Sequence, residues 1–438
     1  MQPTDWHLDS LALENFRAYE SLTIPFESDL TVVIGVNGEG KTSILDALAI
    51  SLGSVLAGFG ESAQGFQQHD VHVAAHDLDS AAAVATLEPV YPVGAEITAT
   101  IAGEEYVWAR ERKSKNGRTT WGDNGVRSRV QLLAEEATKS GEGVTLPVLA
   151  YYGVERLVGV RRDRGTIPTS RLGAYAAALD PKSDLTRLGA YLKSLTTHAT
   201  MDMARDRQLS SPVRAQLDAI DEACAVALDG FGWGEPAWDP LVDSIMLRST
   251  DDGVTLPLAW LSSGLRITAG LVIDLASRMA RANPHLGGRD LREQTPGIVL
   301  IDEVDLHLHP QWQQRIIGNL RTAFPRVQFI VTTHSPQVLS TVPARCIKIL
   351  GEKQVKTVHF SEGLRADVVL QTVQDTPPEP PTENRKTLER YLELVHEDQG
   401  ETDEAKRLRR ELDNDMGGVS TVPELGEADA YMTVFGGE

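Results

Sequence analysis

Eight consecutive residues near the N-terminus combine the residue types that bind a polyphosphate. Residues 35–42 read Gly-Val-Asn-Gly-Glu-Gly-Lys-Thr and satisfy the Walker A spacing G-x-x-x-x-G-K-[ST]. The glycines allow a tight turn that aims backbone amides at phosphate oxygens. We expect Lys41 to contact the β- and γ-phosphates and Thr42 to coordinate Mg²⁺. The predicted ligands are therefore ATP and Mg²⁺, and the predicted nucleotide contacts are Gly35, Asn37, Gly38, Gly40, Lys41, Thr42 and Ser43.

Two adjacent carboxylates follow an apolar run much later in the chain. Residues 298–301 predict a buried strand, which ends at Asp302 and Glu303. Beside a phosphate-binding loop, Asp302 could hold the Mg²⁺ shell while Glu303 orients or deprotonates the attacking water. His334 follows another predicted strand and could contact the γ-phosphate or that water, although a lone histidine there is more often structural. The predicted catalytic residues are Glu303, Lys41 and His334, and the predicted metal ligands are Thr42 and Asp302.

The sequence also contains the elements that would position these residues. The β-branched run at 30–34 predicts a buried strand before the phosphate loop. Apolar residues at helical spacing after the loop predict a helix, whose N-terminus would face the phosphates. Residues 11–16 and 22–26 predict two further strands near the N-terminus. Residues 327–332 predict the strand before His334.

We divide the chain into five segments from its motifs and composition. They are the first half of an ATPase core (1–82), an antiparallel β lobe (83–145), a core strand with an inserted helical region (146–240), the second half of the core (241–360) and an acidic helical tail (361–438). In the β lobe, strands are expected at 83–90, 96–101, 106–112 and 119–121.

The tail carries 19 acidic and 8 basic residues, and it follows a proline-rich linker at 376–381. Amphipathic patterns at 385–396 and 402–415 predict two helices. Two such helices cannot form a core alone, so we expect them to dock on the same chain, a second copy or another protein.

The overall composition limits the classes of function. The formal net charge of −20 argues against indiscriminate binding to nucleic acid. Cys224 and Cys346 are the only cysteines, which excludes a disulfide framework and a cysteine-based zinc cluster. The N-terminus lacks the pattern of a signal peptide, and no apolar run reaches the length of a membrane span. We therefore expect a cytoplasmic protein that does not enter a membrane.

Two groups of residues leave alternatives open. Basic residues gather in the predicted β lobe and after it, interleaved with Trp108, Trp121, Tyr151 and Tyr152, and they could bind DNA or RNA or form ordinary solvated strand faces. These basic residues are Arg110, Arg112, Lys113, Lys115, Arg118, Arg127, Arg129, Arg156, Arg161, Arg162, Arg164 and Arg171. A second group, His69, His72 and His76 with Asp77 beside them, could bind a metal, although solvated loop residues are the commoner case.

The order of motifs resembles the ATP-binding-cassette superfamily in its SMC, RecF and OLD-like branch. After Walker A come L-S-S-G (261–264), I-V-L-I-D-E (298–303), D-L-H-L-H-P (305–310) and T-T-H-S-P (332–336). The resemblance implies an α/β fold: an ABC-ATPase-like P-loop sheet with an antiparallel β lobe, an inserted helical region and a C-terminal helical tail. It also implies a head-to-tail homodimer or a higher even-numbered oligomer with ATP between copies.

The same resemblance assigns roles to further residues. Ser262, Ser263 and Gly264 would contact the γ-phosphate bound by the partner copy, although Ser263 and Leu265 depart from the usual L-S-G-G-Q signature. Residues 305–309 would form the D-loop at the dimer interface, and His334 would be the switch histidine. Gln67 or Gln68 is the candidate Q-loop glutamine.

A narrower set of motifs is similar to the PtuA-type ATPases of Septu and retron anti-phage systems. The matching runs are A-Y-Y-G-V-E-R-L (150–157), L-I-D-E-V-D-L-H-L-H-P-Q-W-Q-Q (300–314), F-I-V-T-T-H-S-P-Q-V-L-S (329–340) and the acidic tail. This likeness implies an ATP-hydrolysing switch that regulates a separate effector, often an HNH nuclease, and we find no nuclease motif in this sequence. The alternatives are a RecF-like DNA-repair clamp and a module that uses ATP only to hold a dimer together.

Overall fold

The computed structural model describes residues 5–76, 86–122, 125–139, 143–156, 170–182, 185–204, 212–377 and 379–435. Asp77, the start of the strand expected at 83–90, and three of the basic residues named above (Arg161, Arg162 and Arg164) lie outside these ranges. The chain divides into two compact units, Met1–Val369 and Leu370–Glu438.

A six-stranded sheet forms the centre of the first unit. Its order is β15 (Gln354–Thr357), β14 (Ile347–Gly351), β3 (Leu30–Gly35), β13 (Val327–Thr332), β12 (Gly297–Ile301) and β8 (Val148–Tyr152). All these strands are parallel except β15, which pairs antiparallel with β14. The strands β12, β13 and β8 are buried at every position, because a parallel sheet is covered on both faces. The predicted α/β fold is confirmed.

A second, antiparallel sheet has the order β2-β1-β6-β7. Its strands are β2 (Tyr19–Pro25), β1 (Trp6–Phe16), β6 (Val93–Ile101) and β7 (Glu104–Arg112), so the two N-terminal strands belong to the β lobe. The strand expected at 119–121 is wrong, because these residues form an irregular segment before helix α3 (Val126–Lys139). Two short strands, β4 (Val73–His76) and β5 (Thr86–Pro89), pair antiparallel and come just before β6 in the sequence.

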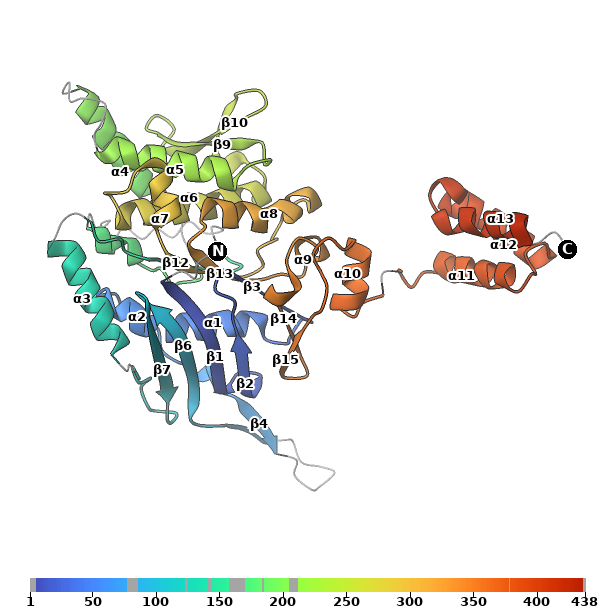
Figure 1. Cartoon of the computed structure of the whole chain (residues 1–438), viewed down its shortest axis with the longest axis horizontal. Coiled ribbons are helices and arrows are strands. Elements are labelled where there is room, and N and C mark those ends of the chain that lie inside the picture. The colour runs from blue at the N-terminus through green and yellow to red at the C-terminus, as the bar shows by residue number, and fades with distance from the viewer. Residues whose placement is uncertain are drawn as a thin grey trace. The chain divides into compact units, whose positions relative to one another are not determined.

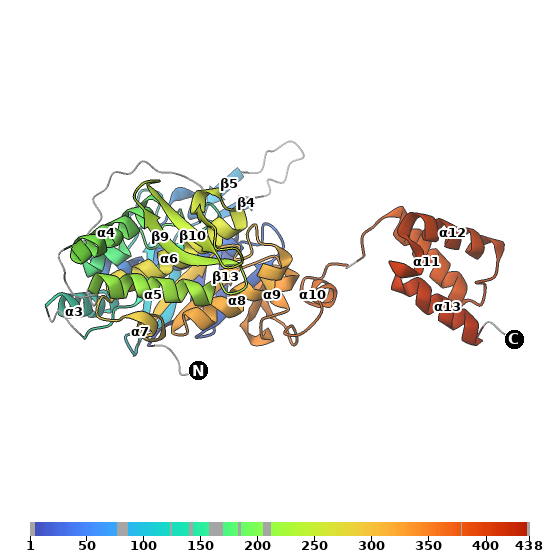
Figure 2. The ribbon, with the colours of Figure 1, turned by 90° about the horizontal axis from the view of Figure 1, so that it is seen from above.

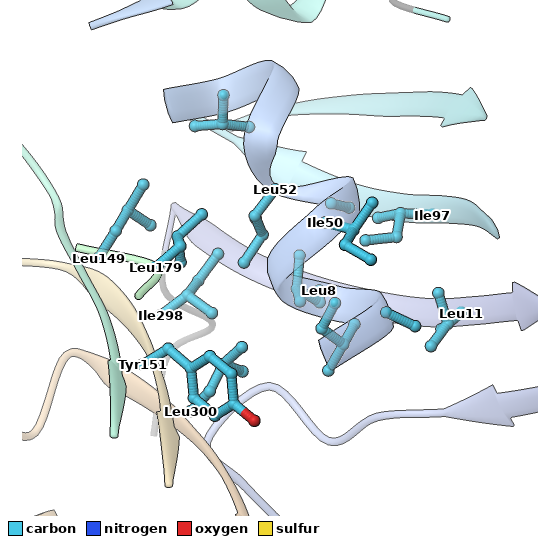
Figure 3. Packing of buried hydrophobic residues seen from close by; sticks show 14 of the residues in the cluster. Leu8, Leu11, Ile50, Leu52, Ile97, Leu149, Tyr151, Leu179, Ile298 and Leu300 are labelled. Atoms are coloured by element: carbon cyan, nitrogen blue, oxygen red, sulfur yellow. The ribbon is translucent and has the colours of Figure 1, made fainter. Parts of the chain in front are cut away.

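The core lies between the two sheets around α1 (Lys41–Ser51) and α2 (Gly53–Gly58). Figure 3 shows Ile50 and Leu52 at the end of α1 gathering with side chains from both sheets, which are Leu8, Leu11, Ile97, Leu149, Ile298 and Leu300. The stretch Lys41–Gly58 has the length and apolarity of a membrane span, and 78% of it is buried in the fold. That burial is typical of a core helix, in which each buried leucine or isoleucine contributes about 1.5–3 kcal/mol.

Helices and a third sheet surround the parallel sheet. The helices are α4 (Leu185–Ala204), α5 (Pro212–Ala227), α6 (Ser263–Ala282), α7 (Gly288–Gln294), α8 (Pro310–Ala323) and α9 (Pro336–Leu339), and α10 (Ala366–Val373) contains the boundary between the two units. The third sheet has the order β11 (Thr255–Pro257), β10 (Ser244–Ser249) and β9 (Trp233–Asp239). Both views place α4 and α5 beside β9 (Figures 1 and 2). The helical region expected within residues 146–240 thus includes α4 and α5.

The second unit contains α11 (Glu383–His396), α12 (Asp403–Met416) and α13 (Pro423–Phe435). The three helices share a hydrophobic cluster that includes Leu388, Tyr391, Leu412 and Leu425. Arg409 Nη2 on α12 also contacts Asp429 Oδ2 on α13 at 2.9 Å. The expectation that the tail helices lack a core of their own is wrong, because α13 adds a third apolar face to the two helices that the sequence predicted.

Candidate nucleotide site

Three predicted motifs follow neighbouring strands of the parallel sheet. Thr332 at the end of β13 pairs with Val33 of β3, and Ile301 at the end of β12 pairs with Val331 of β13. The phosphate loop, the T-T-H-S-P run and the Asp302–Glu303 pair therefore leave the sheet at one edge. The carboxyl ends of parallel strands are where α/β proteins place their ligands.

The conformation of the phosphate loop requires glycine at position 40. Gly40 has φ +84°, and a Cβ atom there would lie 2.9 Å from the Tyr19 ring. The hydroxyl of this buried tyrosine donates a hydrogen bond to the carbonyl of Glu39, and this bond holds the loop against β2. Burial raises the pKa of Tyr19 to about 12, so the hydroxyl keeps its proton. Helix α1 then begins at Lys41 with its first backbone amides available to an anion.

Thr42 and Asp302 meet although 260 residues separate them. Thr42 Oγ1 donates a hydrogen bond of 2.8 Å to Asp302 Oδ2, and Thr332 Oγ1 donates one of 2.6 Å to Asp302 Oδ1. A hydroxyl and a carboxylate side by side fit Mg²⁺, which proteins hold through one or two oxygen ligands while substrate phosphates and water supply the others. The predicted metal ligands are thus brought together in the fold.

Lys41 lies beside the same carboxylates. Its Nζ donates to the carbonyl of Gly35 at 2.8 Å and to that of Val36 at 3.3 Å. Burial lowers the pKa of Lys41, and the nearby charges of Asp302 and Glu303 oppose that fall. The lysine therefore supplies positive charge at the loop, where a polyphosphate could replace the carbonyl oxygens as its partner.

Glu303 has a left-handed backbone, with φ +46°. Its amide donates to Thr332 Oγ1 at 2.8 Å, and its carbonyl accepts a hydrogen bond of 2.8 Å from Arg156 Nη2. Such a conformation is uncommon for a residue other than glycine and often marks a functional site. Sequence reasoning missed both Thr332 and Arg156 as supports of Glu303, although both lie in runs that carried the family likeness.

The predicted signature packs on the predicted D-loop of its own chain. Ser262 and Ser263 are exposed, and Ser262 Oγ caps α6 by accepting from the amide of Leu265 at 3.4 Å. A Cβ atom on Gly264 would lie 2.2 Å from the carbonyl oxygen of His307. His334 is exposed just beyond β13. The roles of these residues toward nucleotide remain predictions.

The candidate Q-loop glutamines lie near a separate cleft of about 700 Å³. Gln67 lines this cleft, together with Arg17, Asp46 and Tyr151. Arg17 Nη1 contacts Asp46 Oδ2 at 2.7 Å, and Tyr151 donates to Asp46 Oδ1 at 2.8 Å. The cleft is not lined by Lys41, Thr42, Asp302 or Glu303, so the fold does not join Gln67 to the phosphate loop through it.

The proposed histidine cluster has no support in the described residues, where no group of three histidine, cysteine, aspartate or glutamate side chains could hold a metal. His72 Nδ1 instead lies 2.6 Å from the carbonyl oxygen of Arg17, and His69 is exposed.

Several of the clustered basic residues point inward. Arg110 is 2% exposed, and its guanidinium donates to carbonyls of Ile50, Gln64 and Thr120. Arg171 similarly donates to the carbonyls of Ala282, Ala137 and Val144. Of the two alternatives left open, these contacts favour a structural role for Arg110, Arg171 and the buried Arg156 over a nucleic-acid surface. Lys113, Lys115 and Arg118 are exposed.

Two family models match overlapping parts of the chain. The model described as "AAA domain, putative AbiEii toxin, Type IV TA system" matches residues 139–340. A second model, described as "AAA domain", matches residues 10–222. Together they span both the phosphate loop and the Asp302–Glu303 pair.

Individual proteins are similar over different lengths. The "Retron Ec83 probable ATPase" of Escherichia coli is 27% identical over 92% of this chain and 83% of that protein. The Septu protein PtuA of Bacillus mycoides is 43% identical over 68 residues, which are 16% of this chain and 10% of that protein. A crystal structure of an SMC head bound to the C-winged helix domain of ScpA covers 81% of this chain and 98% of that one, with 17% identity and a TM-score of 0.46.

Proposed function

We propose that this chain, a P-loop protein related to the retron ATPases and to Septu PtuA, binds ATP with Mg²⁺ and hydrolyses it to ADP and phosphate. One observation carries the proposal. Thr42 and Asp302, from motifs 260 residues apart, meet at 2.8 Å beside the buried Lys41. In P-loop NTPases a loop Ser or Thr and a strand-end Asp hold Mg²⁺ together, and the contact places these two groups close enough to do so.

The residues divide the chemistry among them. Backbone amides of the loop and the Lys41 ammonium would hold the β- and γ-phosphates, while Thr42 and Asp302 would hold the metal. Bound Mg²⁺ would neutralise charge on the transferring phosphoryl group. Glu303 would orient the attacking water and accept its proton as the new P–O bond forms and the bond to ADP breaks. His334 would contact the γ-phosphate or that water.

We further propose that two copies act together. Ser262, Ser263 and Gly264 of one copy would complete the ATP site of the other in a head-to-tail dimer or a higher even-numbered assembly. The exposure of both serines at the start of α6 supports this role. By likeness to the retron and Septu proteins, the ATP state would regulate a separate effector of an anti-phage system, such as an HNH nuclease, in the cytoplasm.

The test compares wild type with Lys41→Ala and Glu303→Gln. We expect Lys41→Ala to lose ATP binding in calorimetry, because the loop would lose the ammonium group that is expected to hold the β- and γ-phosphates. We expect Glu303→Gln to bind ATP without turnover and to accumulate as a dimer in native mass measurements. Turnover at the wild-type rate would remove Glu303 from catalysis, and a monomer at saturating ATP would contradict the head-to-tail arrangement.

The effector is tested by capturing the tagged chain from its native locus, with and without ATP. A second polypeptide whose retention or activity changes with ATP supports the switch. If only an ATP-dependent dimer bound to DNA is recovered, the switch is wrong.

A RecF-like DNA clamp is the second candidate, because Lys113, Lys115 and Arg118 are exposed in one segment after β7. Salt-dependent DNA affinity that falls when these three residues are replaced by glutamate would favour it. The buried Arg110 is a poor probe of DNA binding, because its replacement would disturb the fold.

A further inference from the structure

Arg156 is a buried arginine whose hydrogen bonds go to backbone carbonyls. It lies four residues after β8, and its side chain is 1% exposed. Nη1 donates to the carbonyls of Gly153, at 3.1 Å, and of Asp302, while Nη2 donates to that of Glu303 at 2.8 Å. In the described part of the chain, Nε has no hydrogen-bond partner. Two of the three acceptors therefore belong to the carboxylate residues of the candidate site.

Keeping a guanidinium in this position is costly. Burial lowers the pKa of Arg156 to about 10, and the charges of Asp302, Glu303 and Asp305 oppose that fall. A buried cation that donates to carbonyls rather than to a carboxylate gains less from each contact. An apolar side chain of similar volume could be buried there without this desolvation penalty. The contacts to Asp302 and Glu303 therefore call for a functional explanation.

Arg156 holds a backbone segment with an uncommon conformation. Glu303 has φ +46°, a conformation that would relax toward the ordinary region without support. Thr332 of β13 fixes the amide of Glu303, and Arg156 after β8 fixes its carbonyl. Because β13 and β8 flank β12 on opposite sides, the turn that carries Glu303 is held from both neighbouring strands.

We propose that Arg156 is a positioning residue for hydrolysis, which holds the backbone of Asp302 and Glu303 so that the Glu303 carboxylate keeps its direction. The inference rests on the proposed ATP hydrolysis. Neither charge nor proton moves through Arg156, because its contacts are to carbonyl oxygens. Its loss should therefore slow the chemical step more than it weakens ATP binding.

Strand β8, which precedes Arg156, also contacts two helices near the site through its tyrosines. The Tyr151 hydroxyl donates to Asp46 on α1, and the Tyr152 hydroxyl donates to Asp274 on α6, both at 2.8 Å. Helix α1 follows the phosphate loop, and α6 follows the predicted signature. Hydrogen bonds thus tie the strand that precedes Arg156 to both helices.

Arg110 provides a matched control. It is also buried, burial likewise lowers its pKa to about 10, and it also donates to three backbone carbonyls. Its acceptors lie outside the nucleotide motifs, and Ile50 is at the end of α1 that is farther from the phosphate loop. The experiment measures kcat, KM for ATP with Mg²⁺ and the melting temperature for Arg156→Lys, Arg156→Gln, Arg110→Lys and Arg110→Gln.

We expect Arg156→Lys to reduce kcat about 10-fold and Arg156→Gln about 100-fold, because small misplacements of a catalytic group have effects of this size. KM should stay within about 3-fold, since the phosphate contacts are not changed. The Arg110 variants should lower the melting temperature but keep kcat within about 2-fold. Unchanged kcat in the Arg156 variants, or an equal fall in the Arg110 variants, would overturn the inference.

Amide hydrogen exchange separates this inference from the proposed function. Arg156→Gln should speed exchange across residues 301–306 about 10-fold relative to wild type and Arg110→Gln, because the turn loses the hydrogen bonds from the guanidinium to the carbonyls of Asp302 and Glu303. Unchanged exchange there would overturn the role of Arg156 even if wild type showed no turnover. Absent turnover in wild type, with faster exchange in the variant, would instead overturn the proposed hydrolysis alone.

Discussion

Replacing Gly264 by alanine should destabilise the first unit by forcing two backbone segments apart. The new Cβ would lie 2.2 Å from the carbonyl oxygen and 2.9 Å from the carbonyl carbon of His307. An ordinary contact needs roughly 1 Å more, and both neighbours are backbone atoms that no rotamer change can move. Overpacking of this kind costs about 1–3 kcal/mol of unfolding free energy. We expect Gly264→Ala to lose that amount.

Gly318→Ala is the matched control, and we expect it to raise the unfolding free energy. Gly318 lies inside α8, and nothing lies within 4 Å of the position that its Cβ would take. Alanine there removes the flexibility of glycine in a helix and should add about 0.5–1 kcal/mol. The two substitutions add the same methyl group, so their difference isolates the contact with His307.

Urea unfolding followed by tryptophan fluorescence measures both changes. All 7 tryptophans of the chain lie within Met1–Val369, so the signal reports the first unit alone. The Gly264→Ala midpoint should fall and the Gly318→Ala midpoint should rise, with the slope unchanged. If Gly264→Ala is as stable as wild type, the close packing of the signature on the D-loop is wrong.

Two further predictions concern pH and the second unit. Burial first, and then the charges of Asp218 and Glu235, raise the pKa of Asp221 to about 6. The Asp221 carboxyl therefore binds more protons in the folded than in the unfolded state between about pH 4 and pH 6, so its contribution to the unfolding free energy of the first unit should fall as pH rises through that window. Asp221→Asn should reduce this dependence in the tryptophan assay, and an unaltered profile would show that the carboxyl titrates normally. For the second unit, the isolated segment 370–438 should be helical and melt cooperatively, because α11, α12 and α13 share their own core; a non-cooperative circular dichroism melt would contradict that independence.

The candidate site was predictable where its residues form contiguous motifs. The loop at 35–42 and the pair Asp302–Glu303 carry their chemistry in residue types and spacing, and the strands beside them are apolar runs that can be recognised locally. The contact of Thr42 with Asp302 then follows from the strand order, in which only β13 lies between β3 and β12.

Arg156 and the tail show what local patterns could not reveal. Arg156 looks like any other residue of a basic cluster, and its burial depends on the pairing of Tyr152 with Ile301 across two distant strands. The burial of Arg110 likewise depends on contacts with residues distant in the sequence, Ile50 and Gln64. In the tail, α13 has a weakly amphipathic sequence after Pro423, so its share in the core of that unit appears only when three helices are packed together.

The position of β3 in the sheet also has a consequence during synthesis of the chain. Its hydrogen-bonding neighbours, β13 and β14, are both encoded after residue 326, so the ribosome makes the phosphate loop long before either partner. At about 5–20 residues per second, the 260 residues between Thr42 and Asp302 take roughly 13–52 s to translate. Throughout that interval β3 has two unpaired edges, and a nascent chain needs protection from aggregation. A chain terminated near Glu303 would therefore be a substrate for chaperones and proteases rather than a half-active competitor of the full protein.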